Sequence, residues 1–286
     1  MKVETLTASP LRTATPVDPD DPSGVARAVR ATLLELSRRG GAPHIASALS
    51  TVDILVAAYW YVLRDDPHAV AGPDRDRLVF SKGHAATALY AALGHLGRIP
   101  WSTLASFNEP GSPLQEHPGP GCAPGVELAT GSLGHGLPVA LGMAEAIRLR
   151  RSPARVFVLM SDGECNEGSV WEAAMLAPAR RLTNLCVVVD FNKWQATDRS
   201  RDVMAIDPLA EKWRSFGWSA TEVDGHDIDE LVAALSSVPA DAPTAIVAHT
   251  TKGAGISFME DDNNWHYRQL DDETLDRALE ELGGIW

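Results

Sequence analysis

Short apolar runs alternate with helical segments along most of this chain. The runs cover residues 78–80, 155–160, 185–190 and 245–250, and a further strand is expected at residues 218–223. Helical patterns cover residues 24–39, 50–63, 86–96, 137–150, 169–177, 207–216, 227–236 and 271–282. Continuous apolar strands are typical of parallel sheets that are buried on both faces, and strands separated by helices fit crossover connections. The sequence therefore predicts an α/β fold in which a parallel sheet carries helices on both faces.

We expect one domain, preceded by an arm. The 286 residues suffice for one large α/β domain, and no linker interrupts the pattern. Residues 1–23 are rich in Thr, Pro and Asp, which predicts a mobile N-terminal arm and leaves residues 24–286 for the domain. Residues 108–131 are rich in Gly and Pro without clear periodicity, and a loop of this length is usually functional or disordered.

Charge and composition argue against several classes of partner. The formal net charge of −13 disfavours nucleic acid and anionic membranes, because both need a basic protein face. The longest apolar run, residues 54–63, is too short to cross a bilayer as a helix, so we expect a buried core helix. Three cysteines without a CxxC pair, and no visible secretory signal, fit a reducing cytoplasm.

A cluster of polar and acidic residues follows the apolar run at 155–160. Residues 161–168 have the sequence S-D-G-E-C-N-E-G, and a helical pattern follows them. The cluster therefore lies on a loop between a strand and a helix, which is where open α/β sheets bind ligands. Gly and Asp are also common in such turns for backbone reasons alone. By itself the stretch leaves a ligand site and an ordinary turn about equally open.

A second polar residue at the end of the next strand makes a ligand site more specific. Asp162 follows the strand at 155–160, and Asn192 follows the strand at 185–190. Neighbouring strands of a β-α-β unit bring their C-terminal ends side by side. Carboxylate and amide oxygens suit Mg²⁺, which completes its shell with water and diphosphate oxygens. Gly163 would let the backbone approach the phosphates. These residues predict an anchor for Mg²⁺ and a diphosphate.

Five motifs, in one order, resemble those of transketolases, which use thiamine diphosphate. The acidic loop followed by F-N-K-W (191–194) resembles the thiamine diphosphate motif, and E-C-N-E-G-S-V-W-E (164–172) is similar to its transketolase form. The other motifs are S-K-G-H-A-A-T-A-L-Y (81–90), E-H-P (116–118), T-G-S-L-G-H-G-L (130–137) and K-G-A-G-I-S-F-M-E with W-H (252–266). Five motifs in order are far more specific than one. The closest likeness is to the N-terminal, diphosphate-binding subunit of transketolases that are split over two chains.

The resemblance implies which residues bind the cofactor and the metal. Asp162, Asn192 and the carbonyl of Trp194 would hold Mg²⁺. Further cofactor contacts would come from Gly131, Leu133, Gly163, Glu164 and His84. The implied fold is the diphosphate-binding domain of thiamine diphosphate enzymes.

The resemblance also implies the reaction, which is transfer of a two-carbon ketol unit from a ketose or ketose phosphate to an aldehyde. The cofactor is the electron sink, while the protein moves hydroxyl protons. Histidine suits this task because its proton changes hands near neutral pH. The implied catalytic residues are His44, His84, His117, His266 and Glu167, the last at a subunit interface. His68, His95, His226 and His249 have no such context, and we expect surface or core roles for them.

Four positions depart from the usual motifs. Ser161 replaces the first glycine of G-D-G, and Pro43 precedes His44 where glycine is common. His135 stands in place of glutamine, and Tyr267 in place of the glycine after the last histidine. Most of these changes lie near the implied active site. They suggest an unusual substrate, as in a specialised biosynthetic pathway.

The resemblance ends with the diphosphate-binding domain, which implies a partner. A second subunit would carry the pyrimidine-binding and C-terminal domains, most simply in an α₂β₂ heterotetramer, and this chain would be inactive without it. Two alternatives stay open. The chain could be the α subunit of another thiamine diphosphate enzyme that acts on a 2-oxoacid, or a cofactor-binding partner without catalysis. The E-C-N-E-G loop argues against the first, and the retained Asp162, Asn192 and His84 argue against the second.

Overall fold

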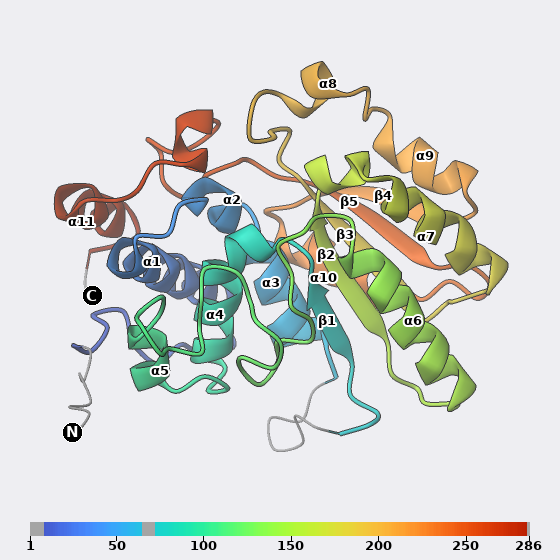
Figure 1. Ribbon diagram of the computed structural model, residues 1–286, viewed down its shortest axis with the longest axis horizontal. Coiled ribbons are helices and arrows are strands. Elements are labelled where there is room, and N and C mark those ends of the chain that lie inside the picture. The colour runs from blue at the N-terminus through green and yellow to red at the C-terminus, as the bar shows by residue number, and fades with distance from the viewer. Residues whose placement is uncertain (1–8, 65–71, 285–286) are drawn as a thin grey trace.

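The computed structural model describes residues 9–64 and 72–284, and its centre is one parallel sheet (Figure 1). The strands are β1 (Arg77–Phe80), β2 (Val156–Ser161), β3 (Leu185–Phe191), β4 (Ser219–Asp224) and β5 (Thr244–His249). They lie in the order β1-β2-β3-β5-β4, and every neighbouring pair is parallel. The predicted α/β fold is thereby confirmed.

Helices cover both faces of the sheet, as Figure 1 shows. One face carries α1 (Pro22–Gly40), α3 (Val52–Val56), α4 (Ala86–His95) and α10 (Ile228–Ser236), and α11 (Asp272–Glu281) packs outside α1. The other face carries α6 (Gly136–Leu149), α7 (Gly168–Ala179) and α9 (Leu209–Ser215). Short helices are α2 (Ile45–Leu49), α5 (Trp101–Ala105) and α8 (Ser200–Val203).

The central strand β3 shows why its apolar run is continuous. Successive side chains of a strand point to opposite faces. Cys186 and Val188 belong to the core under α1 and α4, whereas Val187 and Val189 belong to the core under α6 and α7. All residues of β3 are buried. A strand buried on both faces needs apolar residues at both sets of positions.

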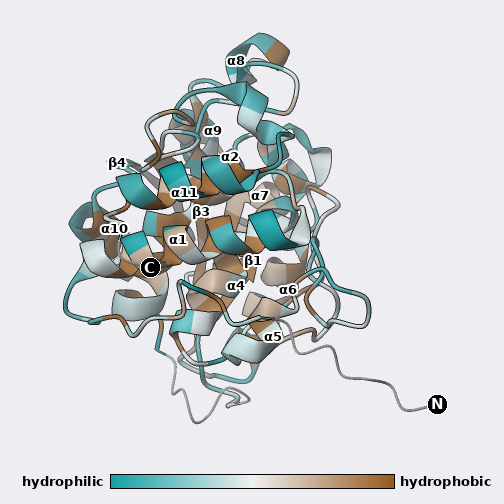
Figure 2. Cartoon of the chain, turned by 90° about the vertical axis from the view of Figure 1, so that its left-hand side faces the viewer, coloured by the Kyte–Doolittle hydropathy of each residue, from teal (hydrophilic) through white to brown (hydrophobic). Residues whose placement is uncertain are grey.

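The outer helices are amphipathic and have clear end signals. In α11, the buried residues Leu275, Ala278 and Leu279 recur every three or four positions, and Figure 2 shows hydrophilic and hydrophobic residues alternating along this surface helix. Helix α1 begins where Asp21 accepts a hydrogen bond from the backbone N–H of Gly24 (2.9 Å). It ends at Gly41, whose φ of 61° is the left-handed conformation that glycine adopts readily.

Part of the predicted mobile arm is packed against the domain. Residues 1–8 lie outside the described residues, but Leu11 and Thr13 are buried. The backbone N–H and the hydroxyl of Thr13 both donate to Glu35 Oε2 (3.1 and 3.0 Å). Glu35 is itself buried in α1, so these bonds satisfy a carboxylate that would otherwise be costly. Residues 11–13 of the predicted arm therefore pack against α1.

The apolar segment before residue 63 is longer than predicted. Helical structure starts at α2 and runs through α3 into a π-helical turn, Ala57–Val62. Ile45–Val62 is long and apolar enough to pass a length-and-composition criterion for a membrane span, yet 83% of it is buried inside the protein. Burial on all sides hides the helical period, which explains the missed start. The prediction of a buried core helix is confirmed.

The loop at residues 108–131 contains neither helix nor strand, as expected. It is nevertheless anchored: Leu114 is buried, and Tyr90 donates a hydrogen bond to the carbonyl of Gln115 (3.1 Å). Its end passes close to the loop after β1. A Cβ added to Gly83 would lie 2.5 Å from the backbone of residues 130 and 131. Glycine at this position lets the loop lie against the carboxyl edge of the sheet.

Candidate active site

A cavity of about 310 Å³ lies at the carboxyl ends of β1, β2 and β3, where open parallel sheets bind ligands. We call it the carboxyl-edge cavity. Lys82, Ser161 and Asn192 line it from these three strand ends. All site residues predicted from the sequence contribute to its wall except Asp162, Glu164 and Glu167. Residues from distant parts of the chain thus meet at one site, as the motifs predicted.

Asp162 lies just beneath the wall and is fully buried. Its Oδ1 accepts the backbone N–H of Gly163 (2.8 Å), and its Oδ2 accepts the N–H of Lys193 (3.0 Å) and the hydroxyl of Ser200 (2.7 Å). Burial raises the pKa of Asp162 to about 6, although the Ser200 hydroxyl opposes this shift. A carboxylate with two oxygens and three donors keeps capacity for one more partner, such as a cation.

Asn192 and Trp194 lie beside Asp162 because β2 and β3 pair in register, with Ser161 opposite Asp190. The Asn192 amide oxygen accepts the backbone N–H of Trp194 (3.1 Å). The following residues form a small hairpin, in which Trp194 bridges to Arg199. These contacts fix Asn192 and Trp194 on one turn, and the turn lies beside Asp162, the third residue that the motifs indicated as a metal ligand.

A clamp outside the cavity holds this hairpin. Arg199 lies over the ring of Trp194, 3.8 Å from its centroid, and forms two bonds to Asp261 (2.7 and 2.6 Å). The indole N–H of Trp194 donates to the same carboxylate (2.8 Å). Asp261 belongs to the segment after β5, so the clamp joins the loops that follow β3 and β5.

Three histidine rings gather in the cavity. Ring centroids of His44 lie 5.4 Å from His84 and 4.9 Å from His266, and the latter two lie 6.3 Å apart. His117 also lines the cavity, from the long loop. A Cβ on Gly131, whose φ is 148°, would lie 2.7 Å from the His117 ring, so glycine permits this approach.

The backbone of His44 takes an unusual conformation to join this cluster. Its φ is 66°, in the left-handed region that few residues other than glycine occupy. Its N–H donates to the carbonyl of His266 (2.8 Å). Pro43, one of the departures from the usual motifs, therefore precedes a defined turn at the start of α2. Strain of this kind is concentrated at functional sites.

The histidines are held neutral. Burial, followed by the charges of His117 and Lys252, lowers the pKa of His44 to about 4. Burial and Lys252 lower the pKa of His266 to about 3, and burial with Lys82 places the pKa of His84 well below its ordinary value. In the chain without a ligand, burial and the nearby charges thus move the pKa values of these three imidazoles below the neutral range. Neutral rings can still donate and accept hydrogen bonds.

Two buried lysines belong to the site but were not predicted as site residues from the sequence. Lys82 and Lys252 are both 0% exposed. The Lys82 ammonium forms an ion pair with the buried Asp190 and donates to the carbonyl of Ser47 (2.8 Å). The Lys252 ammonium donates to Asn263 Oδ1 (2.6 Å) and to His266 Nδ1 (3.0 Å). Both lie within motifs already singled out, S-K-G-H and K-G-A-G, which was the available signal. Residues 251–254 are called the lysine turn below.

Glu164 and Glu167 do not line the carboxyl-edge cavity. Glu164 is fully buried, and its Oε1 accepts the Ser81 hydroxyl (2.5 Å) and the Gly134 N–H (2.9 Å). Burial raises the pKa of Glu164 to about 7, although the Ser81 bond opposes this shift. Its side chain supports the loop that carries Leu133. Glu167 is exposed at the start of α7, where a second protein could reach it.

The residues present fit a diphosphate cofactor and a hard cation. Asp162, Asn192 and the Trp194 carbonyl offer oxygen ligands, which Mg²⁺ prefers. The buried Gln195 Nε2, from a wall residue, has no hydrogen-bond partner among the residues that the structure describes. An oxygen-rich ligand would satisfy such a donor. Lys82 and Lys252 supply positive charge to this part of an acidic chain.

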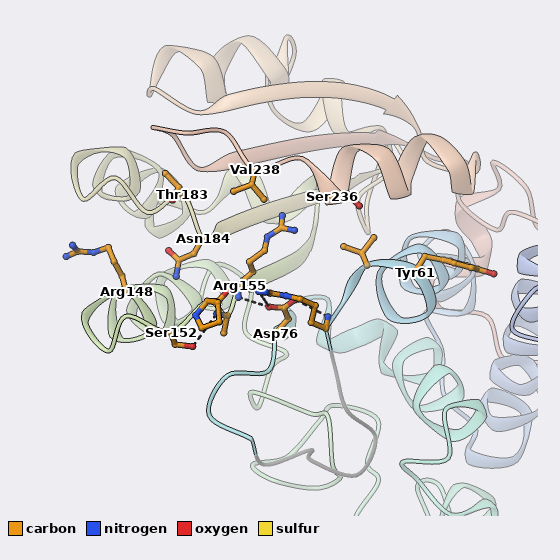
Figure 3. Close-up of a pocket in the computed structure, with 13 residues that line it drawn as sticks. Tyr61, Asp76, Arg148, Ser152, Arg155, Thr183, Asn184, Ser236 and Val238 are labelled. Atoms are coloured by element: carbon orange, nitrogen blue, oxygen red, sulfur yellow. Dashed lines mark hydrogen bonds and ion pairs between the residues drawn. The ribbon is translucent and has the colours of Figure 1, made fainter.

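A second cavity of about 550 Å³ lies at the opposite, amino-terminal edge of the sheet (Figure 3). Its charged groups already have partners in the protein. Arg64 pairs with Asp76 (3.0 Å), and Arg155 donates to the carbonyl of Leu235 at the end of α10 (2.8 Å). These contacts give both arginines a structural role, so the cavity's larger volume does not make it the candidate site.

Comparison with known sequences identifies the domain. Residues 23–284 match the family described as transketolase, thiamine diphosphate binding domain. The chain is 42% identical to one subunit of the apulose-4-phosphate transketolase of Actinobacillus succinogenes and 39% identical to the 6-deoxy-6-sulfo-D-fructose transketolase subunit SqwG of a Clostridium species. Each alignment covers 90% of this chain and 94% of the relative. Human transketolase is 34% identical over 90% of this chain, but only 41% of the human protein is covered.

Solved structures agree with this result. Transketolase from Leishmania mexicana superposes with a TM-score of 0.84 at 25% identity, over 94% of this chain and 42% of that one. Transketolase from Campylobacter jejuni gives a TM-score of 0.82 at 26% identity, over 93% and 42%. The chain therefore spans about two fifths of these solved enzymes. Its fold, its motifs and the matched family together show that the chain belongs to the transketolase family and is a thiamine diphosphate-binding domain of that family.

Proposed function

We propose that the chain is the diphosphate-binding subunit of a transketolase made of two kinds of chain. The complex transfers a two-carbon ketol unit from a ketose or ketose phosphate to an aldehyde. The single observation that carries this proposal is the share of each relative's length that this chain matches. The chain matches nearly the whole of two relatives that are named transketolase subunits, but less than half of human transketolase.

Mg²⁺ and thiamine diphosphate would share the carboxyl-edge cavity. Asp162, Asn192 and the Trp194 carbonyl would hold the cation, and Gly131, Leu133, Gly163 and His84 would contact the cofactor. When bound, the cofactor supplies the electron sink for cleaving and forming the carbon–carbon bond. The donors on Asp162 come from fixed backbone and side-chain groups, so the ligand geometry exists before the cation arrives.

The histidines would orient substrate hydroxyls and carry their protons. In the chain alone they are neutral, so each ring offers one N–H donor and one acceptor nitrogen. An anion bound beside them would raise their pKa values towards neutrality, because opposite charge favours the protonated imidazole. This would bring His44, His84 and His266 closer to the range in which histidine transfers protons, and His117 would contact the substrate beside them.

The rest of the active site would come from a partner subunit. We propose that it carries the pyrimidine-binding and C-terminal domains and that two copies of each chain form an α₂β₂ complex. Glu167 would lie at that interface, which its exposed position at the start of α7 permits. A cytoplasmic location is proposed because all three cysteines are free.

The substrates are proposed to be unusual sugars. The two subunit relatives are named for apulose 4-phosphate and for a sulfonated deoxyfructose. Pro43, His135 and Tyr267 depart from the common motifs. Tyr267 is 64% exposed and lies edge-on to the rings of His266 and His44, with centroid distances of 4.6 and 5.6 Å. It therefore stands beside the histidine cluster, where glycine is usual.

The first test is the native mass and cofactor content of the complex isolated from the chain's own source. We expect a partner of comparable size and retained thiamine diphosphate. A chain found alone and without cofactor would favour a binding protein without catalysis.

Within the reconstituted complex, Asp162→Ala should abolish cofactor-dependent ketol transfer, and activity that survives this change would refute the metal site. Pyruvate decarboxylation by the wild type would instead favour a 2-oxoacid enzyme.

A further inference from the structure

We propose that a buried network centred on Asp53 is a positioning device for His266 in the carboxyl-edge cavity. Asp53 binds the side chains of Arg30 and His226, and both of these form hydrogen bonds to the lysine turn. The turn positions Lys252 so that its ammonium group contacts His266. Asp53 is on α3, outside the cavity wall. Each link is a hydrogen bond between groups that are buried or partly buried.

Asp53 is a carboxylate that is fully engaged by two partners. Arg30 binds both of its oxygens, with Nη1 to Oδ1 at 3.0 Å and Nη2 to Oδ2 at 2.5 Å. His226 Nδ1 lies 2.7 Å from Oδ2. Burial alone would raise the pKa of Asp53, but His226 and Arg30 together lower it below its ordinary value. A buried charge is costly when it is unpaired. Removing one of Asp53, Arg30 and His226 should therefore disturb the positions of the other two.

The two partners of Asp53 hold opposite ends of the lysine turn. His226 Nε2 accepts the backbone N–H of Thr251 (2.8 Å), and Arg30 Nε donates to the carbonyl of Ala254 (3.0 Å). A backbone N–H can only donate, so Nε2 of His226 carries no proton and Nδ1 donates to Asp53. The aspartate therefore fixes the tautomer that the turn requires.

Two further backbone bonds leave the turn little freedom. The N–H of Gly253 donates to the carbonyl of Ala46 (2.9 Å), and the carbonyl of Lys252 accepts the N–H of Asp261 (2.8 Å). Gly253 has a φ of 83°, and an added Cβ would lie 2.2 Å from the carbonyl oxygen of Met259. Glycine is thus required here, and the position of the Lys252 backbone is fixed from several sides.

The turn determines which nitrogen of His266 carries the proton. An ammonium group has donors only, so Lys252 Nζ must donate to His266 Nδ1 across their 3.0 Å contact. The proton of the neutral imidazole is then on Nε2. His266 lines the cavity with a ring whose free nitrogen is an N–H donor. Such a donor suits a hydroxyl, carbonyl or phosphate oxygen of a ligand.

A purely structural network would behave differently from a positioning device. In the structural case, breaking it lowers stability but leaves the tautomer of His266 unchanged. In the positioning case, the tautomer changes even in variants that remain folded. The readout must therefore report the protonation of the imidazole nitrogens rather than activity or melting temperature.

The test is ¹⁵N NMR of the imidazoles in the full chain at pH 7, without cofactor or partner, with His266→Gln identifying the signals. We expect wild-type His266 to show a pyridine-like Nδ1 and a pyrrole-like Nε2. Lys252→Met should shift both signals towards a mixture of the two tautomers. Asp53→Asn should shift them in the same direction, because the lysine turn loses its support. Unchanged His266 signals in either variant would overturn the proposal.

Two further variants keep the result interpretable. Should Asp53→Asn fail to fold, His226→Ala removes the Thr251 acceptor at a partly exposed site and is expected to shift His266 in the same way. Glu222→Gln is the matched control, since it breaks a histidine–carboxylate pair of the same length, 2.7 Å to His249, that supplies none of the hydrogen bonds to the lysine turn. An equal shift of His266 in this control would also overturn the proposal. The idea that His266 faces a cofactor or substrate in the carboxyl-edge cavity rests on the proposed function. The NMR measurement of the His266 tautomer does not depend on that function, so the two can fail separately.

Discussion

Acid should destabilise the chain partly through the neutral histidines of the carboxyl-edge cavity. The pKa of His44 is about 4 in the folded chain, against 6.5 as its ordinary value. Between these values the unfolded chain binds a proton at this ring and the folded chain does not. The stability that the neutral ring contributes is therefore present above pH 6.5 and is lost as pH falls towards 4. Linkage gives a loss of about 2 kcal/mol between pH 7 and pH 5 for this one ring.

The perturbation that isolates this effect is His44→Asn. Asparagine tolerates the left-handed backbone of this residue and has no group that titrates between pH 5 and 7. Urea unfolding of the full chain without cofactor, at both pH values, gives the free energy of unfolding from the midpoint and slope. We expect the variant to lose about 2 kcal/mol less stability than the wild type between pH 7 and pH 5.

The argument fails if His44→Asn and wild type lose equal stability over this range. The imidazole would then titrate alike in the folded and unfolded chains, and the cavity would not hold it neutral. A difference in stability at pH 7 alone decides nothing, because truncating a buried ring also removes packing. Only the change in pH dependence tests the protonation state.

Three further predictions concern the surroundings of the cavity. Glu164→Gln should act with the opposite sign to the histidine change. The folded pKa of Glu164 is about 7, so protonation of this one carboxyl contributes about 2 kcal/mol of stability as pH falls from 7 to 5. The variant lacks this contribution and should therefore lose about 2 kcal/mol more than wild type over this range in urea unfolding. Ser200→Ala removes a hydroxyl that donates to Asp162 and should weaken Mg²⁺-dependent binding of thiamine diphosphate about tenfold in calorimetry. Asp261→Asn weakens a partly exposed clamp and should cost less than about 1 kcal/mol of stability, with a smaller loss of cofactor affinity than Ser200→Ala.

Much of the fold and the outline of the site follow from local patterns. The strands that carry Asp162 and Asn192 are continuous apolar runs, and a β-α-β connection places their ends together whatever the rest of the chain does. The short helices α5 and α8 were missed because five and four residues are too few to show a period. The packed part of the arm was missed because its partner, Glu35, lies in another element.

The charges of the site could not be predicted from the sequence. Lysine is usually solvated, and nothing local indicates that Lys82 and Lys252 are fully buried. Their burial depends on Asp190, Asn263 and other groups that only the folded chain brings near. The same is true of the histidines, whose residue type suggests a proton that moves near neutral pH. Their low pKa values come from burial and from the two lysines.

The two lysines differ in a way that bears on what the cavity binds. Lys82 forms an ion pair with Asp190, whereas the described contacts of Lys252 are neutral groups, Asn263 and His266. Burial, and then the charge of Lys82, lowers the pKa of Lys252 to about 8. A buried ammonium whose described hydrogen-bond partners are all neutral is costly, and an anionic ligand would relieve that cost. A diphosphate is such a ligand, and it would strengthen the charge on Lys252 that fixes the proton of His266. Lys252 would then respond to the cofactor's charge from behind the cavity wall and also orient the proton of His266, so loss of Lys252 should weaken both cofactor binding and the order of the imidazole.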